Sequence, residues 1–274
     1  MQGKNRKIHK PFTQGRMGRG ILKKYGKLSV IPKERSFPMI DTVFFDLDGT
    51  LLPMDQEEFV NTYMGLLAKK MAPQGYDPKH LVAAVWAGTQ AMVENDGKQT
   101  NEAVFWADFC HIFGENARKD EPLFAEFYAA DFGQVRTVCG FAPEAAELMG
   151  LLKEKGVRRA LATNPLFPEI ATRQRIRWAG LEPEDFEIIT TYENSRFCKP
   201  NPEYYRDLLD KLGLEPENCL MVGNDVDEDM LPAKKAGMQT FLLTPCLINR
   251  GQTDIGEFHR GGFAELKEFL LKEL

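Results

Sequence analysis

The sequence predicts an α/β fold, in which a doubly wound parallel sheet carries an inserted α-helical domain. Three observations favour this class. From Met39 onward, short apolar runs alternate with stretches of helical periodicity, as in parallel strands joined by helices. Residues 54–137 interrupt the alternation with helical periodicity alone. Acidic residues follow two of the apolar runs, at the strand ends where ligands bind in such folds.

The elements of the sheet domain follow one another in a regular order. Predicted strands cover 42–46, 158–162, 187–191, 219–222 and 239–243. Predicted helices cover 143–155, 168–179, 202–212 and 229–236, and a last amphipathic helix covers 264–274. Several of these helices have proline near the first turn and glycine just past the end, which are the usual boundary residues. Right-handed crossovers then bring the carboxyl ends of the strands to one edge.

The insertion at 54–137 is predicted to be a separate helical cap domain. Apolar residues recur there at helical spacing, as Phe59, Tyr63 and Leu67 illustrate. The core domain would then comprise 39–53 and 138–274. We interpret the aromatic stripes of the insertion mainly as the core of the cap, with one or two side chains left to line a pocket.

Residues 1–38 form a basic segment with a different composition. They hold eleven Lys or Arg and one acidic residue, whereas the remainder holds 24 basic and 39 acidic residues. Because the segment has little apolar periodicity, we expect a disordered extension, or a natural start at Met39. Binding of nucleic acid or of an anionic membrane would rest on this segment alone and is disfavoured.

The rest of the composition is that of an ordinary globular protein. No apolar run approaches the roughly 18 residues of a membrane span, and no signal-peptide pattern follows the N-terminus, so we expect a cytoplasmic protein without membrane contact. The five cysteines include no CxxC pair, and the four histidines are far apart. These patterns indicate neither a disulfide framework nor a zinc site.

Two carboxylates follow the first predicted strand. Asp46 and Asp48 are separated by one residue in the run Phe44-Phe45-Asp46-Leu47-Asp48-Gly49-Thr50. A turn with a capping aspartate is the structural alternative. An acid directly after an apolar strand is costly without a partner, however, so a functional role is favoured.

Polar groups also follow three later strands. Thr163 and Asn164 come after the second strand and offer a hydroxyl and loop N–H groups to phosphate oxygens. Lys199 lies in a Lys-Pro-Asn-Pro run ahead of a helix. The fourth strand ends in the acidic run 225–229, whose oxygen ligands suit a hard cation.

Together these four elements, in this order and each at a strand end, resemble the haloacid dehalogenase superfamily of phosphatases. The resemblance extends from Met39 to about Pro245 and implies a Rossmann-like core. An insertion directly after the first motif is similar to the subfamily with a type 1 helical cap. The resemblance implies a phosphatase that acts on a small phosphorylated metabolite.

The resemblance also implies roles for single residues. Asp46 would be the nucleophile that forms an aspartyl-phosphate, and Asp48 the general acid and base. Thr163, with the backbone around Asn164, would bind the phosphoryl group. Lys199 would neutralise the phosphoryl oxygens and the nucleophile.

The implied cofactor is Mg²⁺. Its ligands would be the Asp46 carboxylate, the Asp48 backbone carbonyl and Asp225, with Asp229 behind them. Asn224 stands where the family commonly has glycine, and Gly223 comes one place early. The sequence therefore leaves open whether Asp225 or Asp227 contacts the metal.

Other functions remain compatible with the motifs. Asp48 argues against a dehalogenase, which needs no acid there. A phosphomutase would keep all four motifs, and a catalytically idle binding module could reuse the fold. Sugar phosphates, phosphoglycolate-like acids and nucleotides all remain open as substrates, although the cap has no basic cluster for a polyanionic one.

Overall fold

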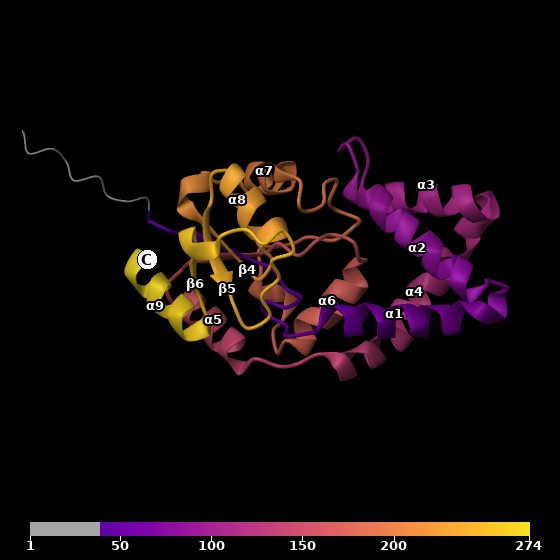
Figure 1. Ribbon diagram of the computed structural model, residues 1–274, viewed down its shortest axis with the longest axis horizontal. Helices are drawn as coiled ribbons and strands as arrows, with labels where there is room; N and C mark the ends of the chain where they lie inside the picture. The colour runs from indigo at the N-terminus through magenta and orange to yellow at the C-terminus, as the bar shows by residue number, and fades with distance from the viewer. Residues whose placement is uncertain (1–38) are drawn as a thin grey trace, which may run out of the picture. The chain divides into compact units, whose positions relative to one another are not determined.

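The computed structural model describes residues 39–274, and Figure 1 labels several of their helices and strands. A six-stranded parallel sheet has the order β3-β2-β1-β4-β5-β6. Its strands are β1 (Thr42–Phe45), β2 (Arg158–Leu161), β3 (Ile188–Ile189), β4 (Cys219–Gly223), β5 (Gln239–Leu243) and β6 (His259–Gly261). Because strand order runs outward in both directions from β1, the predicted doubly wound parallel sheet is confirmed.

The strand β1 lies in the centre of the sheet and is buried on both sides. Phe45 lies opposite Leu161 of β2 and Val222 of β4. Residues Val43 to Phe45 have no exposed surface. A strand covered on both faces is expected to be apolar throughout, which accounts for the unbroken run before Asp46.

Helices cover both faces of the sheet. Val43 and Phe45 belong to the core cluster that includes Leu148 and Leu266, whereas Phe44 points to the other face. The first face is covered by α5 (Pro143–Glu154), α6 (Glu169–Trp178) and α9 (Phe263–Glu273), and the second by α7 (Pro202–Leu212) and α8 (Leu231–Lys235). The alternation follows from the two-residue period of a strand.

Two elements differ from the prediction. The helix predicted at 229–236 is a wide turn at Val226–Met230 followed by the short α8. In this turn the Met230 and Leu231 N–H groups donate to carbonyls five residues earlier in the chain. The strand β6 was not predicted. It has three residues, of which His259 and Arg260 are exposed, so it carries no apolar run to recognise.

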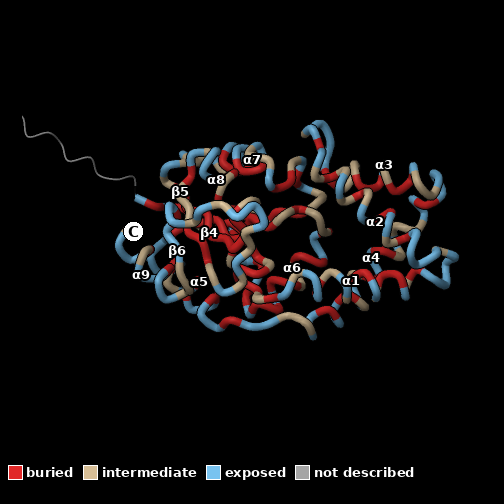
Figure 2. The backbone as a smooth tube through the Cα atoms, in the orientation of Figure 1, coloured by how far each residue is buried: buried red, intermediate tan, exposed pale blue. Residues whose placement is uncertain are grey.

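The insertion after β1 contains helices and no strand within the described residues. Its elements are α1 (Gln56–Met71), α2 (Pro78–Val93), α3 (Asn101–Phe113) and α4 (Glu121–Ala130), with shorter helical turns at Ala72–Gln74, Glu115–Asp120 and Asp131–Val138. Aromatic edge-to-face contacts fill its centre, as between Trp106 and Phe124 at 5.3 Å. Figure 2 shows buried backbone on the strands and on the inward sides of these helices.

The ends of the insertion meet, since Met54 and Cys139 form an isolated bridge. The described residues all fall in one compact unit, so the division into core and cap remains a prediction. The predicted basic extension at 1–38 lies outside the described residues. Among the described helices, none has the length and apolar character needed to cross a bilayer.

Candidate active site

The first predicted site residue, Asp46, extends β1 by one position. Its backbone N–H donates to the Val222 carbonyl at 2.9 Å, which holds the chain in line with β4. The turn that follows needs glycine, because Gly49 has φ +86° and a Cβ there would lie 2.4 Å from the Asn224 side chain. Asp46 therefore lies at the carboxyl end of a central strand, with 7% of the residue exposed.

The Asp46 carboxylate is held at both oxygens. Oδ1 accepts from Lys199 Nζ at 2.9 Å, and Oδ2 accepts from Thr50 Oγ1 at 2.9 Å. Thr50 also lies 3.0 Å from Asn224 Oδ1. The sequence prediction did not include Thr50, although it belongs to the motif that contains both aspartates.

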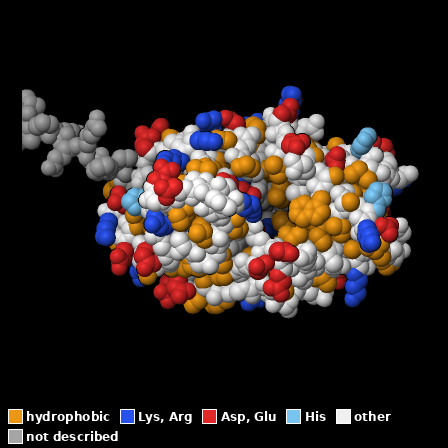
Figure 3. All heavy atoms as spheres, viewed as in Figure 1, with side chains coloured by type: hydrophobic (Ala, Val, Ile, Leu, Met, Phe, Trp, Pro, Cys, Tyr) orange, Lys and Arg blue, Asp and Glu red, His pale blue; other side chains and the backbone are white. Residues whose placement is uncertain are grey.

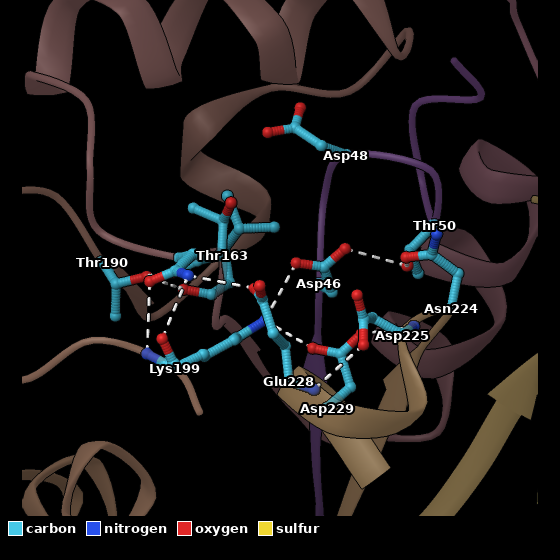
Figure 4. Close-up of polar contacts among 12 residues, drawn as sticks. Asp46, Asp48, Thr50, Thr163, Thr190, Lys199, Asn224, Asp225, Glu228 and Asp229 are labelled. Carbon is cyan, nitrogen blue, oxygen red and sulfur yellow. Dashed lines mark hydrogen bonds and ion pairs between the residues drawn. The ribbon is translucent and has the colours of Figure 1, made fainter. Parts of the chain in front are cut away.

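Lys199 is buried and contacts two carboxylates (Figure 4). Its Nζ lies 2.9 Å from Asp46 Oδ1 and 2.6 Å from Asp229 Oδ1. Burial acts to lower the pKa of Lys199, but the carboxylates of Asp229 and Asp46 outweigh burial and hold the pKa well above its usual value. The lysine therefore stays cationic beside the predicted nucleophile.

The side chains of the acidic run after β4 point in different directions and have different partners. Asp225 Oδ1 accepts from the N–H groups of Asp227 and Glu228 at 2.9 and 3.0 Å, and Oδ2 accepts from Arg250 Nη1 at 2.6 Å. Asp229 Oδ2 accepts from the Asp225 N–H at 3.0 Å. The Asp229 carboxylate thus supports both Asp225 and Lys199.

Side-chain packing explains why this run has glycine at position 223. A Cβ on Gly223 would lie 2.2 Å from Asp229 Oδ2, so a side chain there would displace the carboxylate that Lys199 needs. Asp227 turns away, and its carboxylate accepts from the Gly251 N–H at 3.2 Å. Asp225 lines the same pocket as Asp46 whereas Asp227 does not, which favours Asp225 of the two metal candidates.

Asp48 lies apart from the cluster around Lys199 (Figure 4) and pairs with a different cation. Its Oδ2 accepts from Nη1 of Arg175, a fully buried residue of α6. Its Oδ1 is buried and has no hydrogen-bond partner within the described chain. Burial raises the pKa of Asp48 to about 6, opposed by the Arg175 cation and helped by the Asp46 charge.

Arg175 was missed by the sequence prediction. Its guanidinium lies over the Phe167 ring at 4.3 Å from the centroid, and Nη2 donates to Thr172 Oγ1 at 3.2 Å. The helical period contained a signal, because Ala171, Arg175 and Ile176 all lie on the inward face of the helix predicted there. A charge on such a face requires a buried partner.

Thr163 and Asn164 follow β2 as predicted. Thr163 is 2% exposed, and its carbonyl accepts from Thr190 Oγ1 at 2.6 Å and from the Tyr204 hydroxyl at 2.9 Å. The Asn164 side chain accepts from the Lys199 N–H at 3.2 Å and donates to a Glu228 oxygen at 3.0 Å. Asn164 therefore ties three strand-end loops together with its amide.

These side chains surround one pocket of about 240 Å³. It brings together all the predicted site residues except Lys199, which lies just beneath it against Asp46 and Asp229. The pocket is lined by Asp46, Asp48, Met54, Gln56, Phe59, Val60, Trp86, Thr163, Asn164, Leu166, Phe167, Asn224, Asp225, Glu228 and Asp229.

The donor chemistry of the pocket fits a hard divalent cation. Five carboxylates line the pocket, and three cationic side chains contact them, so negative charge is in excess. Oxygen donors are the ligands that Mg²⁺ prefers. Within residues 39–274, however, no three Asp, Glu, His or Cys side chains are already gathered as a metal-ligand set.

Comparison with known proteins agrees with this geometry. The family profile described as haloacid dehalogenase-like hydrolase matches residues 40–237. A phosphoglycolate phosphatase from Aquifex aeolicus is 26% identical over 200 residues, which cover 73% of this chain and 83% of the relative. Pyrophosphatase PpaX from Halalkalibacterium halodurans is 24% identical, with 80% of this chain and 89% of the relative covered.

A solved structure shows the same fold. The 2-haloacid dehalogenase from Pseudomonas syringae pv. Tomato DC3000 superposes with a TM-score of 0.58 at 20% sequence identity, covering 86% of this chain and all of the other. The chain belongs to the haloacid dehalogenase-like hydrolases. Within that family, the phosphoglycolate phosphatase that matches over most of the chain supports a phosphoric monoester hydrolase.

Proposed function

We propose that this chain is a Mg²⁺-dependent phosphatase that hydrolyses a small phosphorylated metabolite through an aspartyl-phosphate on Asp46. The observation that carries the proposal is the contact of a buried lysine with a strand-end carboxylate, Lys199 Nζ to Asp46 Oδ1 at 2.9 Å, at the floor of a pocket. The ammonium offsets the repulsion between an anionic nucleophile and an anionic phosphoryl group.

The residues divide the first step between them. An Asp46 oxygen attacks phosphorus, and the bond from phosphorus to the leaving oxygen breaks. The Asp48 carboxyl, which lines the pocket, gives its proton to that oxygen. Arg175 holds Oδ2 of Asp48 and so fixes the direction of the carboxyl.

The second step reverses the role of Asp48. Its carboxylate takes a proton from water as the water oxygen attacks phosphorus, and phosphate leaves with the Asp46 carboxylate restored. A pKa raised to about 6 suits a group that must both give and take a proton near neutral pH.

The metal would be held by the Asp46 carboxylate, the Asp48 backbone carbonyl and Asp225, while Asp229 supports Asp225 from behind. When bound it supplies positive charge to the phosphoryl oxygens. Thr163, with the loop N–H groups near Asn164, lies where the phosphoryl oxygens need donors.

Release of inorganic phosphate tests the proposal. The native chain and Asp46→Asn are compared on p-nitrophenyl phosphate and phosphorylated metabolites, with and without Mg²⁺. We expect Mg²⁺-dependent turnover that falls about 10³-fold or more in the variant. Asp41→Asn, an exposed aspartate just before β1, is the matched control and should keep full activity.

Mass spectrometry of the acid-quenched native protein should find one phosphoryl group on the peptide that contains Asp46. Folded, Mg²⁺-loaded protein that releases no phosphate from any compound would contradict the proposal. Conversion of a sugar phosphate into its isomer without phosphate release would indicate a phosphomutase instead.

A further inference from the structure

The pocket has a second half that the chemistry of phosphate transfer does not use. Its wall comes from the insertion and from the loop after β2. Phe59 and Val60 lie on α1, Trp86 lies on α2, and Leu166 and Phe167 belong to the loop. This wall is apolar, and it faces the place where the leaving group of a substrate bound at Asp46 would lie.

The pocket offers no free cation to a second anionic group. Within residues 39–274, no Lys, Arg or His is among its lining residues. The cations nearest to it are already paired. Lys199 contacts Asp46 and Asp229, Arg175 contacts Asp48, and Arg250 contacts Asp225 and Gln56. A carboxylate or second phosphate on the substrate would lose its hydration and meet carboxylates instead of partners.

Trp86 supplies a large apolar surface at the mouth. It is 50% exposed, although it lines the pocket from the middle of α2. In Figure 3 hydrophobic side chains gather over α2 beside a hollow in the surface. An exposed tryptophan beside a pocket gives a flat, rigid surface for an apolar group at low entropic cost.

The part of the apolar wall around Phe167 is held in place by its neighbours before any substrate binds. The Phe167 ring packs edge-on against Phe59 at 6.2 Å and Tyr63 at 5.3 Å, and Arg175 lies over its face at 4.3 Å. Side chains fixed by several neighbours cost little further entropy on binding. The apolar half is thus a preformed site.

From this arrangement we infer the substrate class, namely a phosphate monoester whose leaving group is uncharged and carries an aromatic or similarly flat apolar group. The inference rests on the proposed function and makes it more specific. It separates this chain from the two curated relatives described above, since phosphoglycolate and pyrophosphate each bear a second anionic group beside the transferred phosphoryl group.

Turnover of three primary-alcohol esters tests the class. Benzyl phosphate, ethyl phosphate and 2-phosphoglycolate all release an unactivated alcohol, so differences in kcat/KM report on the pocket. With Mg²⁺ present, we expect kcat/KM for benzyl phosphate to be about 100-fold higher than that for 2-phosphoglycolate. It should be about 10-fold higher than that for ethyl phosphate. A kcat/KM for 2-phosphoglycolate equal to or above that for benzyl phosphate would overturn the inference and leave the proposed function standing.

Two substitutions test whether the apolar wall causes the preference among the phosphate esters. Trp86→Ala should lower the preference for benzyl over ethyl phosphate about 10-fold. Val60→Lys should raise kcat/KM for 2-phosphoglycolate, because it places a cation among the apolar residues. Leu271→Ala removes an exposed apolar side chain of α9, away from the pocket, and should change neither preference.

Binding of non-hydrolysable analogues separates the two proposals. 2-Phenylethylphosphonate and 3-phosphonopropionate replace the bridging oxygen of benzyl phosphate and phosphoglycolate with a methylene. By calorimetry on the native Mg²⁺-loaded chain, we expect the phenyl compound to bind about 10-fold to 100-fold more tightly. That result without any turnover would uphold the pocket and refute the phosphatase, whereas equal or reversed affinities would refute the pocket.

Discussion

The two halves of the pocket are built in opposite ways. The half at the sheet edge is made of charged side chains, with Lys199 and Arg175 each buried against an aspartate. The half formed by the insertion is made mainly of aromatic and aliphatic side chains, with the Gln56 amide as its polar member, and carries no charge. The contrast supports the proposed division, in which the strand ends carry the chemistry and the helical wall selects what is attached to the phosphate. Substitutions at the sheet edge should therefore lower kcat for every substrate, whereas substitutions in the helical wall should change the preference among substrates.

The largest effect is expected from Lys199→Met. Without the ammonium, Asp46 and Asp229 face each other as buried carboxylates and the phosphoryl group loses its cation. We expect kcat to fall about 10²-fold to 10³-fold for every substrate, measured by phosphate release. A loss that differs between benzyl and ethyl phosphate would break the division between the two halves.

The folding of this variant needs its own control, because removing one partner of a buried pair costs about 3–5 kcal/mol. Asp229→Asn keeps the contact between Lys199 and Asp46 while it removes a buried negative charge. Thermal unfolding of both variants by circular dichroism shows whether the lost activity reflects chemistry or an unfolded chain.

Arg175→Met should have the next largest effect. The substitution frees the Asp48 carboxyl, so kcat should fall about 10-fold to 100-fold through lost orientation. The Arg175 cation lowers the pKa of Asp48 against the effect of burial, and its removal should raise that pKa above about 6.

The sign of the pH effect follows from this shift. The protonated acid is required in the first step, so the loss of kcat on the alkaline side should move to higher pH in Arg175→Met than in the native chain. Arg175→Lys keeps the positive charge, so the dependence of kcat on pH should return toward that of the native chain. An unchanged profile in Arg175→Met would show that Arg175 only packs α6.

Arg250→Ala should have a smaller effect, on metal affinity. Arg250 Nη1 lies 2.6 Å from Asp225 Oδ2 and is an exposed competitor for a divalent cation there. Its removal should tighten Mg²⁺ binding about 2-fold to 5-fold, measured as the shift of Tm with Mg²⁺ concentration. Arg260→Ala, at the exposed strand β6, is the matched control. Weaker Mg²⁺ binding in Arg250→Ala would mean that Arg250 positions Asp225 for the metal.

The smallest effect on activity is expected within the insertion. The Tyr128 and Tyr63 hydroxyls share a hydrogen bond of 2.7 Å, and neither residue lines the catalytic pocket. Tyr128→Phe should lower the free energy of unfolding by about 0.5–1.5 kcal/mol and change kcat less than 2-fold, roughly the loss of one neutral hydrogen bond. Urea unfolding and phosphate release measure the two quantities. A large loss of kcat would show that the insertion takes part in the chemistry itself.

The sheet and the candidate residues at its edge could be predicted because their signals are local. The strand β1 is Thr42 followed by three apolar residues, and Asp46 comes directly after them, so the strand and its carboxylate are visible together. The same holds for Thr163 after β2 and for Asp225 after β4. The strand β6 lacked such a run and was missed.

What the sequence by itself determined is the positions of five strands along the chain, the helical nature of the insertion and the set of polar groups at the strand ends. Only the tertiary structure decided which cation meets which acid, since Arg175 and Asp48 are 127 residues apart. It also turned Asp225 into the pocket and Asp227 away from it. The apolar wall around Trp86 was also decided only by the tertiary structure. Side-chain direction and pairing across long separations depend on how elements pack together, whereas a strand and its terminal residue are fixed by neighbouring positions in the chain.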